Sequence, residues 1–314
     1  GANLLNGIAS ALIKSYSSKN PDYGVFEVDE NTLPLLINSF TPKIVVILNL
    51  FRDQLDRYGE VNTIALKWKK ALEKLPTETT VILNADDPQI AFLGQNLKSK
   101  VIYFGLNDPK LYLKTPEHAT DSTYCPKCGE KLFYQGIYYS HVGIYNCNKC
   151  QFKRPHAVNP KIKSNLFGLY NLYNLLAAQI VLNELGFSNE EVENSLINFQ
   201  PAFGRQEEII FNNKKIIILL SKNPTGFNQS IRTLNEFSKE KKTIMLVLND
   251  RIPDGRDISW IWDVDFENLK TSKIFISGDR SYDMALRIKY ADFKNYYIDE
   301  NLKSCLLKAL NETE

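Results

Sequence analysis

The sequence predicts an α/β protein of two domains, with a cysteine-rich insertion in the first. Short β-branched runs alternate with helical stretches between residues 22 and 105, and the alternation returns from about residue 206. This alternation is typical of mostly parallel sheets flanked by helices. Residues 115–160, rich in Tyr, Lys and Cys, separate the two regions and lack it. The 314 residues suffice for roughly two domains of ordinary size.

The first region is expected to contain four strands and one helix. Its apolar runs are too short to cross a bilayer and are typical of buried strands. We expect strands at residues 23–28, 44–49, 79–84 and 101–104, and an amphipathic helix at residues 62–75.

Four of the five cysteines have the spacing of a metal site, C-x2-C-x18-C-x2-C: Cys125, Cys128, Cys147 and Cys150. Two CxxC turns together supply tetrahedral S4 ligation, so we predict a structural zinc ribbon over residues 121–155. The alternatives are unmetallated cysteines or a redox pair. A catalytic zinc is disfavoured because four thiolates leave no open position for water.

The remaining cysteine and the histidines are expected to have no chemical role. Cys305 lies among leucines of a predicted last helix, which indicates a buried, inert thiol. His118, His141 and His156 are interpreted as solvated surface residues, because a closed S4 site needs no fifth ligand.

A helix is expected at residues 166–185, which Gly186 ends, and the second strand–helix alternation follows it from about residue 206. Strands are expected at residues 215–220, 243–248, 273–277 and 295–298. The change of pattern near residues 200–204 places the domain boundary there, giving domains of residues 1–203 and 204–314.

Composition excludes some classes of function. The chain has 38 Lys and Arg against 36 Asp and Glu, and a net charge of +2 gives little support to nucleic-acid binding. The N-terminal segment resembles neither a signal peptide nor a transit peptide, so we expect a cytoplasmic protein.

Polar clusters follow three successive predicted strands, at residues 27–30, 49–57 and 84–88. Ligands of open α/β sheets bind at the carboxyl ends of the strands, and carboxylates there suit Mg²⁺. Asn171 and Asn174 lie three residues apart, hence on one helix face, and an amide can read an adenine edge. Singly, each of these features could be a helix cap or a turn.

Together with residues 168–174 and 204–207, these segments resemble the Mur ligase superfamily of ATP-dependent acid–amine ligases. The cysteine ribbon and residues 51–60, 221–228 and 254–263 resemble more closely the MurT-type subunits of lipid II isoglutaminyl synthase. The resemblance implies a Mur-ligase-like central ATPase domain carrying the ribbon, followed by a Rossmann-like C-terminal domain.

The resemblance also implies a reaction, cofactors and a partner. ATP with Mg²⁺ would activate the α-carboxylate of D-glutamate in the lipid II stem peptide. Ammonia from a GatD-type glutamine amidotransferase subunit, bound as a heterodimer, would then give D-isoglutamine. The work would take place at the inner face of the bacterial membrane, without a transmembrane segment.

Carried over residue by residue, the resemblance assigns the nucleotide site. Glu27 would help hold Mg²⁺, and Asp53 is the acidic residue of the second strand-end motif. The adenine would contact Asn171 and Asn174. Arg205 would meet the nucleotide phosphates, and Lys222 the terminal phosphate. Asp257, with Asp254 as second choice, would complete the catalytic Cys–His pair of the partner.

The sequence departs from the superfamily in lacking a GxxGK[ST] loop, whose backbone amides cradle phosphate. Residues 1–7 resemble the segment that follows this loop, so we expect an N-terminally truncated chain that alone binds ATP weakly or not at all. The alternatives are an amino-acid-adding Mur ligase, a folylpolyglutamate synthetase, and a non-catalytic scaffold for an amidotransferase. A zinc-ribbon nucleic-acid binder ranks last.

Overall fold

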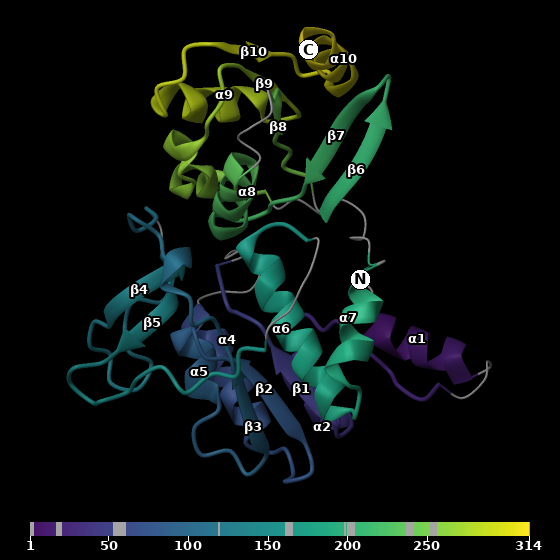
Figure 1. Cartoon of the computed structure of the whole chain (residues 1–314), viewed down its shortest axis with the longest axis vertical. Helices are drawn as coiled ribbons and strands as arrows, with labels where there is room; N and C mark the ends of the chain where they lie inside the picture. Colours follow the sequence, from purple (N-terminus) through teal and green to yellow (C-terminus); the bar gives the residue numbers. More distant parts are fainter. Residues whose placement is uncertain are drawn as a thin grey trace. The chain divides into compact units, whose positions relative to one another are not determined.

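The computed structural model describes residues 3–16, 21–52, 61–118, 120–160, 166–197, 199, 205–236, 242–251 and 256–313 (Figure 1). The side chains of residues 197 and 205 are not described. The chain forms two compact units. Unit 1 consists of Gly1–Pro109, Ser122–Gly136 and His141–Pro160, and unit 2 consists of Lys110–Asp121, Ile137–Ser140 and Lys161–Glu314.

Unit 1 is built on a three-stranded parallel sheet in the order β1-β2-β3. The strands are β1 (Ile44–Ile47), β2 (Thr80–Asn84) and β3 (Lys100–Phe104). Val81, Ile82 and Leu83 of the central strand are completely buried. This continuous apolar run is typical of a parallel strand that is covered on both faces.

The helices of unit 1 are α1 (Leu5–Tyr16), α2 (Leu33–Ser39), α4 (Val61–Leu72) and α5 (Pro88–Leu93). Helix α4 buries Ile64, Trp68 and Leu72, spaced four residues apart, in the same core as β1 and β2. The Trp68 indole also donates a hydrogen bond of 2.7 Å to the Glu30 carbonyl, which fixes the segment before α2.

The insertion contains the hairpin β4 (Phe133–Tyr139) and β5 (Val142–Asn146). Within unit 1 it packs on α5, where Phe92 meets Phe152 edge to face with ring centroids 6.0 Å apart. The two cysteine-bearing turns each close through an isolated antiparallel bridge, Tyr124 with Lys131 and Asn146 with Lys153.

A buried carboxylate fastens the insertion to the sheet. Asp86 follows β2, is fully buried, and forms an ion pair with Arg154 of the insertion. Its Oδ2 accepts from the Leu106 amide at 2.7 Å, and its carbonyl accepts from the Gly143 amide at 2.8 Å. A side chain at Gly105 would place Cβ 2.5 Å from Asp86 Oδ1, so glycine is required beside this pair.

Unit 2 has a second parallel sheet, in the order β10-β9-β8. Its strands are β8 (Ile244–Val247), β9 (Ile274–Ser277) and β10 (Tyr296–Ile298). The helices of this unit are α6 (Leu169–Glu184), α7 (Asn189–Ile197), α8 (Pro224–Glu236), α9 (Ser281–Tyr290) and α10 (Leu302–Glu312). Short 3-10 helices lie at Pro109–Leu111, Ser259–Asp263 and Phe266–Asn268. The core contains Ile274, Ile276 and Met284, all fully buried.

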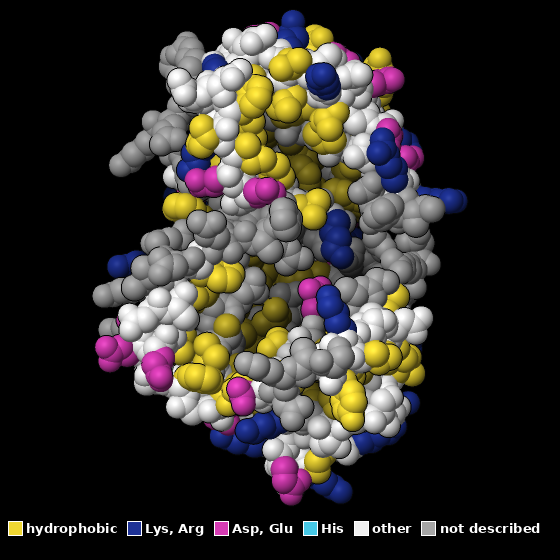
Figure 2. Space-filling model, turned by 90° about the vertical axis from the view of Figure 1, so that its right-hand side faces the viewer, with side chains coloured by type: hydrophobic (Ala, Val, Ile, Leu, Met, Phe, Trp, Pro, Cys, Tyr) yellow, Lys and Arg dark blue, Asp and Glu magenta, His cyan; other side chains and the backbone are white. Residues whose placement is uncertain are grey.

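Unit 2 also contains the antiparallel hairpin β6 (Arg205–Phe211) and β7 (Lys214–Leu219). Asn212 and Asn213 form its turn with φ of 48° and 60°, the left-handed conformation that two-residue hairpin turns of type I′ require. Figure 2 shows apolar side chains, in yellow, gathered on one face of this unit. Ile210 in β6 and Leu220, just after β7, are each about 70% exposed.

Most expected elements are confirmed to within one to three residues at each end, but one strand is wrong. Residues 23–28 form no strand among the described residues, and Val25 is 95% exposed. The segment has an apolar composition without a neighbouring strand to pair with.

Cys305 is fully buried, and burial raises its pKa, as expected for an inert thiol. No helix in the described part of the chain has the length and apolarity to cross a membrane.

We predict that Arg154→Ala destabilises the protein by about 3–5 kcal/mol, because it leaves the Asp86 charge buried without its partner. Urea unfolding followed by circular dichroism measures the loss. Lys153→Ala, at the exposed neighbouring position, is the control and is expected to change the free energy of unfolding by less than about 0.5 kcal/mol. Equal effects of the two substitutions would contradict the role assigned to the ion pair.

Candidate functional site

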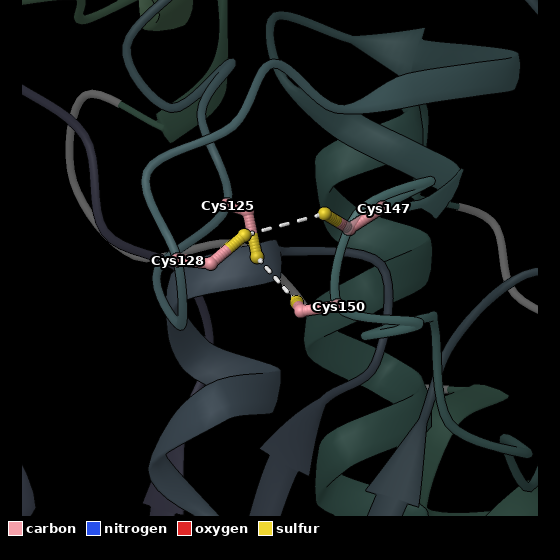
Figure 3. Close-up of side chains that lie close together, drawn as sticks. All are labelled: Cys125, Cys128, Cys147 and Cys150. Atoms are coloured by element: carbon pink, nitrogen blue, oxygen red, sulfur yellow. Dashed lines mark hydrogen bonds between the residues drawn. The ribbon is translucent and has the colours of Figure 1, made fainter.

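The four cysteines converge as the spacing predicted (Figure 3). The Sγ atoms of Cys125 and Cys150 are 3.5 Å apart, as are those of Cys128 and Cys147. All four lie within 4.8 Å of one another. Tetrahedral zinc with Zn–S bonds of about 2.3 Å separates its sulfurs by about 3.8 Å, so the cluster has dimensions compatible with a zinc ion.

The electrostatics of the thiols favour a bound cation. Burial raises the pKa of Cys125 to about 12, so this thiol is neutral without a cation. The backbone amide of Cys150 and that of Lys149 donate to Cys147 and lower its pKa to about 7, against the effect of burial. Because four thiolates cannot ionise side by side without a counter-charge, a dication is the group that this donor set fits.

The carboxylates after β2 serve the fold, which corrects the interpretation of residues 84–88 as a ligand cluster. Asp87 is fully buried and caps α5 by accepting from the Gln89 and Ile90 amides at 2.9 and 3.2 Å. Its other oxygen accepts from the Leu50 amide at 2.9 Å and so ties the end of β1 to α5. With Asp86 paired to Arg154, neither carboxylate is available to a metal.

The interpretation of His141 as a solvated residue is wrong. It is completely buried, with Nε2 3.3 Å from Asp87 Oδ2, and its ring lies 5.0 Å from that of Phe51. Apolar residues on both sides of the hairpin turn draw this histidine into the core, and the buried carboxylate gives it a partner. His156 is exposed as expected. His118 is also exposed, but its Nδ1 lies 2.7 Å from Asp265 Oδ1.

The residues expected at the magnesium side of the nucleotide site belong to unit 1. Glu27 is exposed, whereas its neighbour Asp29 is buried and accepts from the Asn31 amide through its side chain. Glu27 is therefore the most exposed carboxylate of residues 27–30. Asp53 lies outside the described residues.

The residues expected at the adenine side belong to unit 2. Asn171 and Asn174 both lie in the first turns of α6, so their placement on one helix face is confirmed. Asn171 donates through its side-chain amide to the Phe167 carbonyl at 2.7 Å, and Asn174 is exposed. Asn174 therefore has the more accessible amide of the two.

Lys222 is exposed immediately before the start of α8, on a loop that two side chains fix. Asn223 Oδ1 accepts from the Gly226 amide at 2.8 Å and so caps the helix. Ser221 Oγ lies 2.8 Å from Ser230 Oγ, one turn further along α8. The expectation of a fixed loop is confirmed, and the cation stands at the positive end of a helix. Arg205 begins β6, and its side chain lies outside the described part.

Of the two candidates for the third triad residue, Asp257 and Asp254, the structure describes only the first. Asp257 is exposed, and its Oδ1 accepts from the Ser259 amide at 2.8 Å, a bond that lowers the pKa of this carboxyl. Asp254 lies outside the described residues. Of the following tryptophans, Trp260 packs on Phe227 in the core of unit 2, and Trp262 is 46% exposed.

No sequence pattern indicates one polar cluster that the structure contains. Glu117, Asn228, Gln229 and Asp265 meet beside α8 in unit 2, although Glu117 and Asp265 are 148 residues apart in the chain. Each is an unremarkable residue in its own segment, and only the fold brings them together.

The comparisons with known proteins identify the family. Residues 7–182 match the family model of the Mur ligase middle domain, and residues 220–314 match the MurT ligase C-terminal model. The chain is 34% identical, over 93% of its length and 70% of the relative, to the lipid II isoglutaminyl synthase (glutamine-hydrolyzing) subunit MurT of Staphylococcus aureus strain COL. The subunit of the same name from Streptococcus pneumoniae R6 is 31% identical over 99% of this chain and 74% of the relative.

Solved structures agree on the fold. A pseudomurein peptide ligase type C from Methanothermus fervidus superposes with a TM-score of 0.69 and 22% identity, covering 90% of this chain and 61% of that structure. The MurC ligase of Thermotoga maritima superposes with a TM-score of 0.56 and 18% identity, covering 95% of this chain and 61% of that structure. The chain thus spans about three fifths of these structures, and its matches over both units show that it belongs to the Mur ligase family and, within it, to the MurT type.

Proposed function

We propose that this chain is the ligase subunit of a glutamine-dependent enzyme that amidates the α-carboxylate of D-glutamate in lipid II. The observation that supports this most strongly is the match along 93% of the chain to a subunit named for that synthase. In the sequence comparison, amino-acid-adding Mur ligases match a smaller part of the chain, for example 66% for a UDP-N-acetylmuramate–L-alanine ligase of Caldicellulosiruptor saccharolyticus. The C-terminal match and the cysteine ribbon both favour the amidating type over an amino-acid ligase.

The chemistry required of the chain follows from the substrate. A carboxylate becomes an electrophile when ATP phosphorylates it, and ammonia then displaces phosphate from the acyl phosphate. Cations must offset the charge on the transferring phosphoryl group. Lys222, exposed at the positive end of α8, suits a terminal phosphate, and Glu27 suits a hydrated Mg²⁺. Asn174 offers its amide to the adenine.

The partner in this proposal is a GatD-type glutamine amidotransferase that supplies the ammonia. A carboxylate that completes its Cys–His pair must be accessible, ionised and held in one orientation. Asp257 meets these conditions, because it is exposed, its pKa is lowered, and the Ser259 amide fixes its oxygen. Asp254 remains the second candidate. The lipid substrate would place the complex at the inner face of the cell membrane.

We expect Lys222→Ala to lower kcat/KM for amidation by about 100-fold or more, because the charge on the transferred phosphoryl group loses a stabilising cation. The assay combines the full-length natural protein with its amidotransferase, ATP, glutamine and lipid II, and mass spectrometry detects the amidated product. Lys289→Ala, at an exposed lysine of α9, is the control and should retain full activity.

The same assay separates the alternatives. Turnover with a free amino acid in place of glutamine would favour an amino-acid-adding ligase. If the wild-type protein binds its partner but the assay gives no amidated product, and Lys222→Ala and Glu27→Gln leave partner binding unchanged, the chain would be a scaffold and the ligase role would be refuted.

We also propose that the cysteine cluster holds a structural zinc ion. Cys128→Ser is expected to lose the metal, which elemental mass spectrometry of the purified protein measures, and to destabilise the ribbon. Cys305→Ser, at a buried cysteine away from the cluster, is expected to retain it. Purified wild-type protein without zinc, and unchanged by chelators, would contradict this assignment.

A further inference from the structure

The polar cluster beside α8 joins two parts of unit 2 that are distant in sequence. The segment before the ribbon, residues 110–118, is called the strap here, and it carries Glu117. Glu117 Oε2 accepts from the Ser140 amide at 2.7 Å, and Oε1 lies 3.5 Å from Nε2 of Gln229 on α8. The neighbouring Asp265, 4% exposed, exchanges hydrogen bonds of 2.8 and 3.2 Å with Asn228 of the same helix.

The strap and the tip of the β4–β5 hairpin are both fastened to α8. Arg232 donates to the Leu111 carbonyl at 3.0 Å and to the Tyr138 carbonyl at 2.8 Å. The strap pairs with the hairpin through the Leu113 amide, which donates to the Ile137 carbonyl at 2.7 Å. The strap and the tip of the β4–β5 hairpin are thus both held by Arg232 of α8.

This arrangement places two carboxyl groups in one partly buried cluster. Burial raises the pKa of Glu117 to about 7, and the charge of Asp265 adds to the effect, while the Ser140 amide, Arg232 and Asn228 oppose it. Burial also raises the pKa of Asp265, against the effect of His118. Two carboxylates so placed do not readily ionise together.

The contacts of Glu117 act in two directions. The Ser140 amide and Gln229 Nε2 both donate to its carboxyl, and such bonds suit the ionised form. Asp265 accepts from Asn228, an amide that also supports Glu117, so the two carboxyls share one partner on α8. Two carboxyls held this close favour a neutral form for one of them.

We propose that Glu117 is a proton-dependent latch, which in its neutral form fastens the strap and residues 137–140 to α8 and in its ionised form loosens them. The charged groups that face it are Asp265 before the 3-10 helix Phe266–Asn268, His118 on the strap and Arg232 on α8. Glu267 and Arg287 lie behind Asp265 and pair with each other at 2.9 Å.

The direction of the pH effect follows from the difference between the pKa of Glu117 in the docked strap and in the undocked strap. The pKa of Glu117 rises from an ordinary 4.5 to about 7 when the strap is docked. A group whose pKa is raised on docking contributes its full stabilisation below its undocked pKa. That contribution falls as the pH increases and is lost above about 7. The latch therefore holds at acidic pH and loosens between about pH 5 and pH 8.

The latch has a consequence for Lys222 that rests on the proposed function. Lys222 immediately precedes the cap of α8, and Gln229 and Arg232, which hold the strap, lie on the second and third turns of the same helix. Docking of the strap then restrains the helix whose N-terminus presents the lysine to phosphate.

Hydrogen–deuterium exchange of a peptide covering residues 110–118, corrected for the intrinsic pH dependence of exchange, tests the latch. We expect the protection factor to fall on the order of 10-fold between pH 5.5 and pH 8, while a peptide covering β2 stays constant. Glu117→Gln keeps an acceptor for the Ser140 amide without a charge, so its protection should be independent of pH. Glu190→Gln, at an exposed position of α7, should behave as wild type.

Two further variants identify the titrating group. Asp265→Asn removes the neighbouring charge, so the midpoint should move to lower pH. His118→Gln should leave the midpoint in place. Protection that is independent of pH in the wild type, or a pH dependence that survives in Glu117→Gln, would overturn the proposal. Hydrogen–deuterium exchange requires neither ATP nor a partner, so the result tests the latch whether or not the proposed amidation function is correct.

Discussion

The buried Asp86 carboxylate is the constraint on which the architecture of unit 1 depends. It stands where β2 ends, and its oxygens hold the loop after β3 and the arginine of the insertion. A charge at this depth is tolerable because each oxygen has a donor and a cation lies beside it. The cysteine ribbon is thereby fastened to the end of the sheet, and its own buried cluster includes Ala91 of α5.

Helix α8 has a similar organising role in unit 2 to that of Asp86 in unit 1. Its N-terminus is capped by Asn223 and presents Lys222, its next turns hold Asp265 and the strap, and its apolar residues enter the core with β8 and β9. The motif of residues 221–228 therefore combines two tasks. Lys222 is exposed just before the helix, while the amide side chains that follow it, Asn223 and Asn228, cap the helix and hold Asp265.

The sequence was sufficient where a pattern is local. The strands β1, β2, β3 and β7 to β10 have dense β-branched runs, and the paired CxxC turns fix the sulfur geometry through their own backbone. It was insufficient where a contact is distant. The extended segment at residues 23–28 reads as a strand because composition does not reveal whether a partner strand is present. His141 reads as a surface residue because its partner, Asp87, lies 54 residues earlier in the chain.

The strand-end clusters show why recognising a motif does not establish what each residue does. Residues 27–30 and 84–88 look alike in sequence, since both place carboxylates directly after apolar residues. In the structure, Asp86 and Asp87 are fully buried and saturated with backbone donors, whereas Glu27 is exposed. A carboxylate that already accepts several protein hydrogen bonds has little to offer a hydrated cation, because the metal would have to displace partners that the fold requires. Burial therefore divides these acidic residues into those that build the sheet edge, Asp86 and Asp87, and those that remain exposed, such as Glu27, and this division depends on the folded chain.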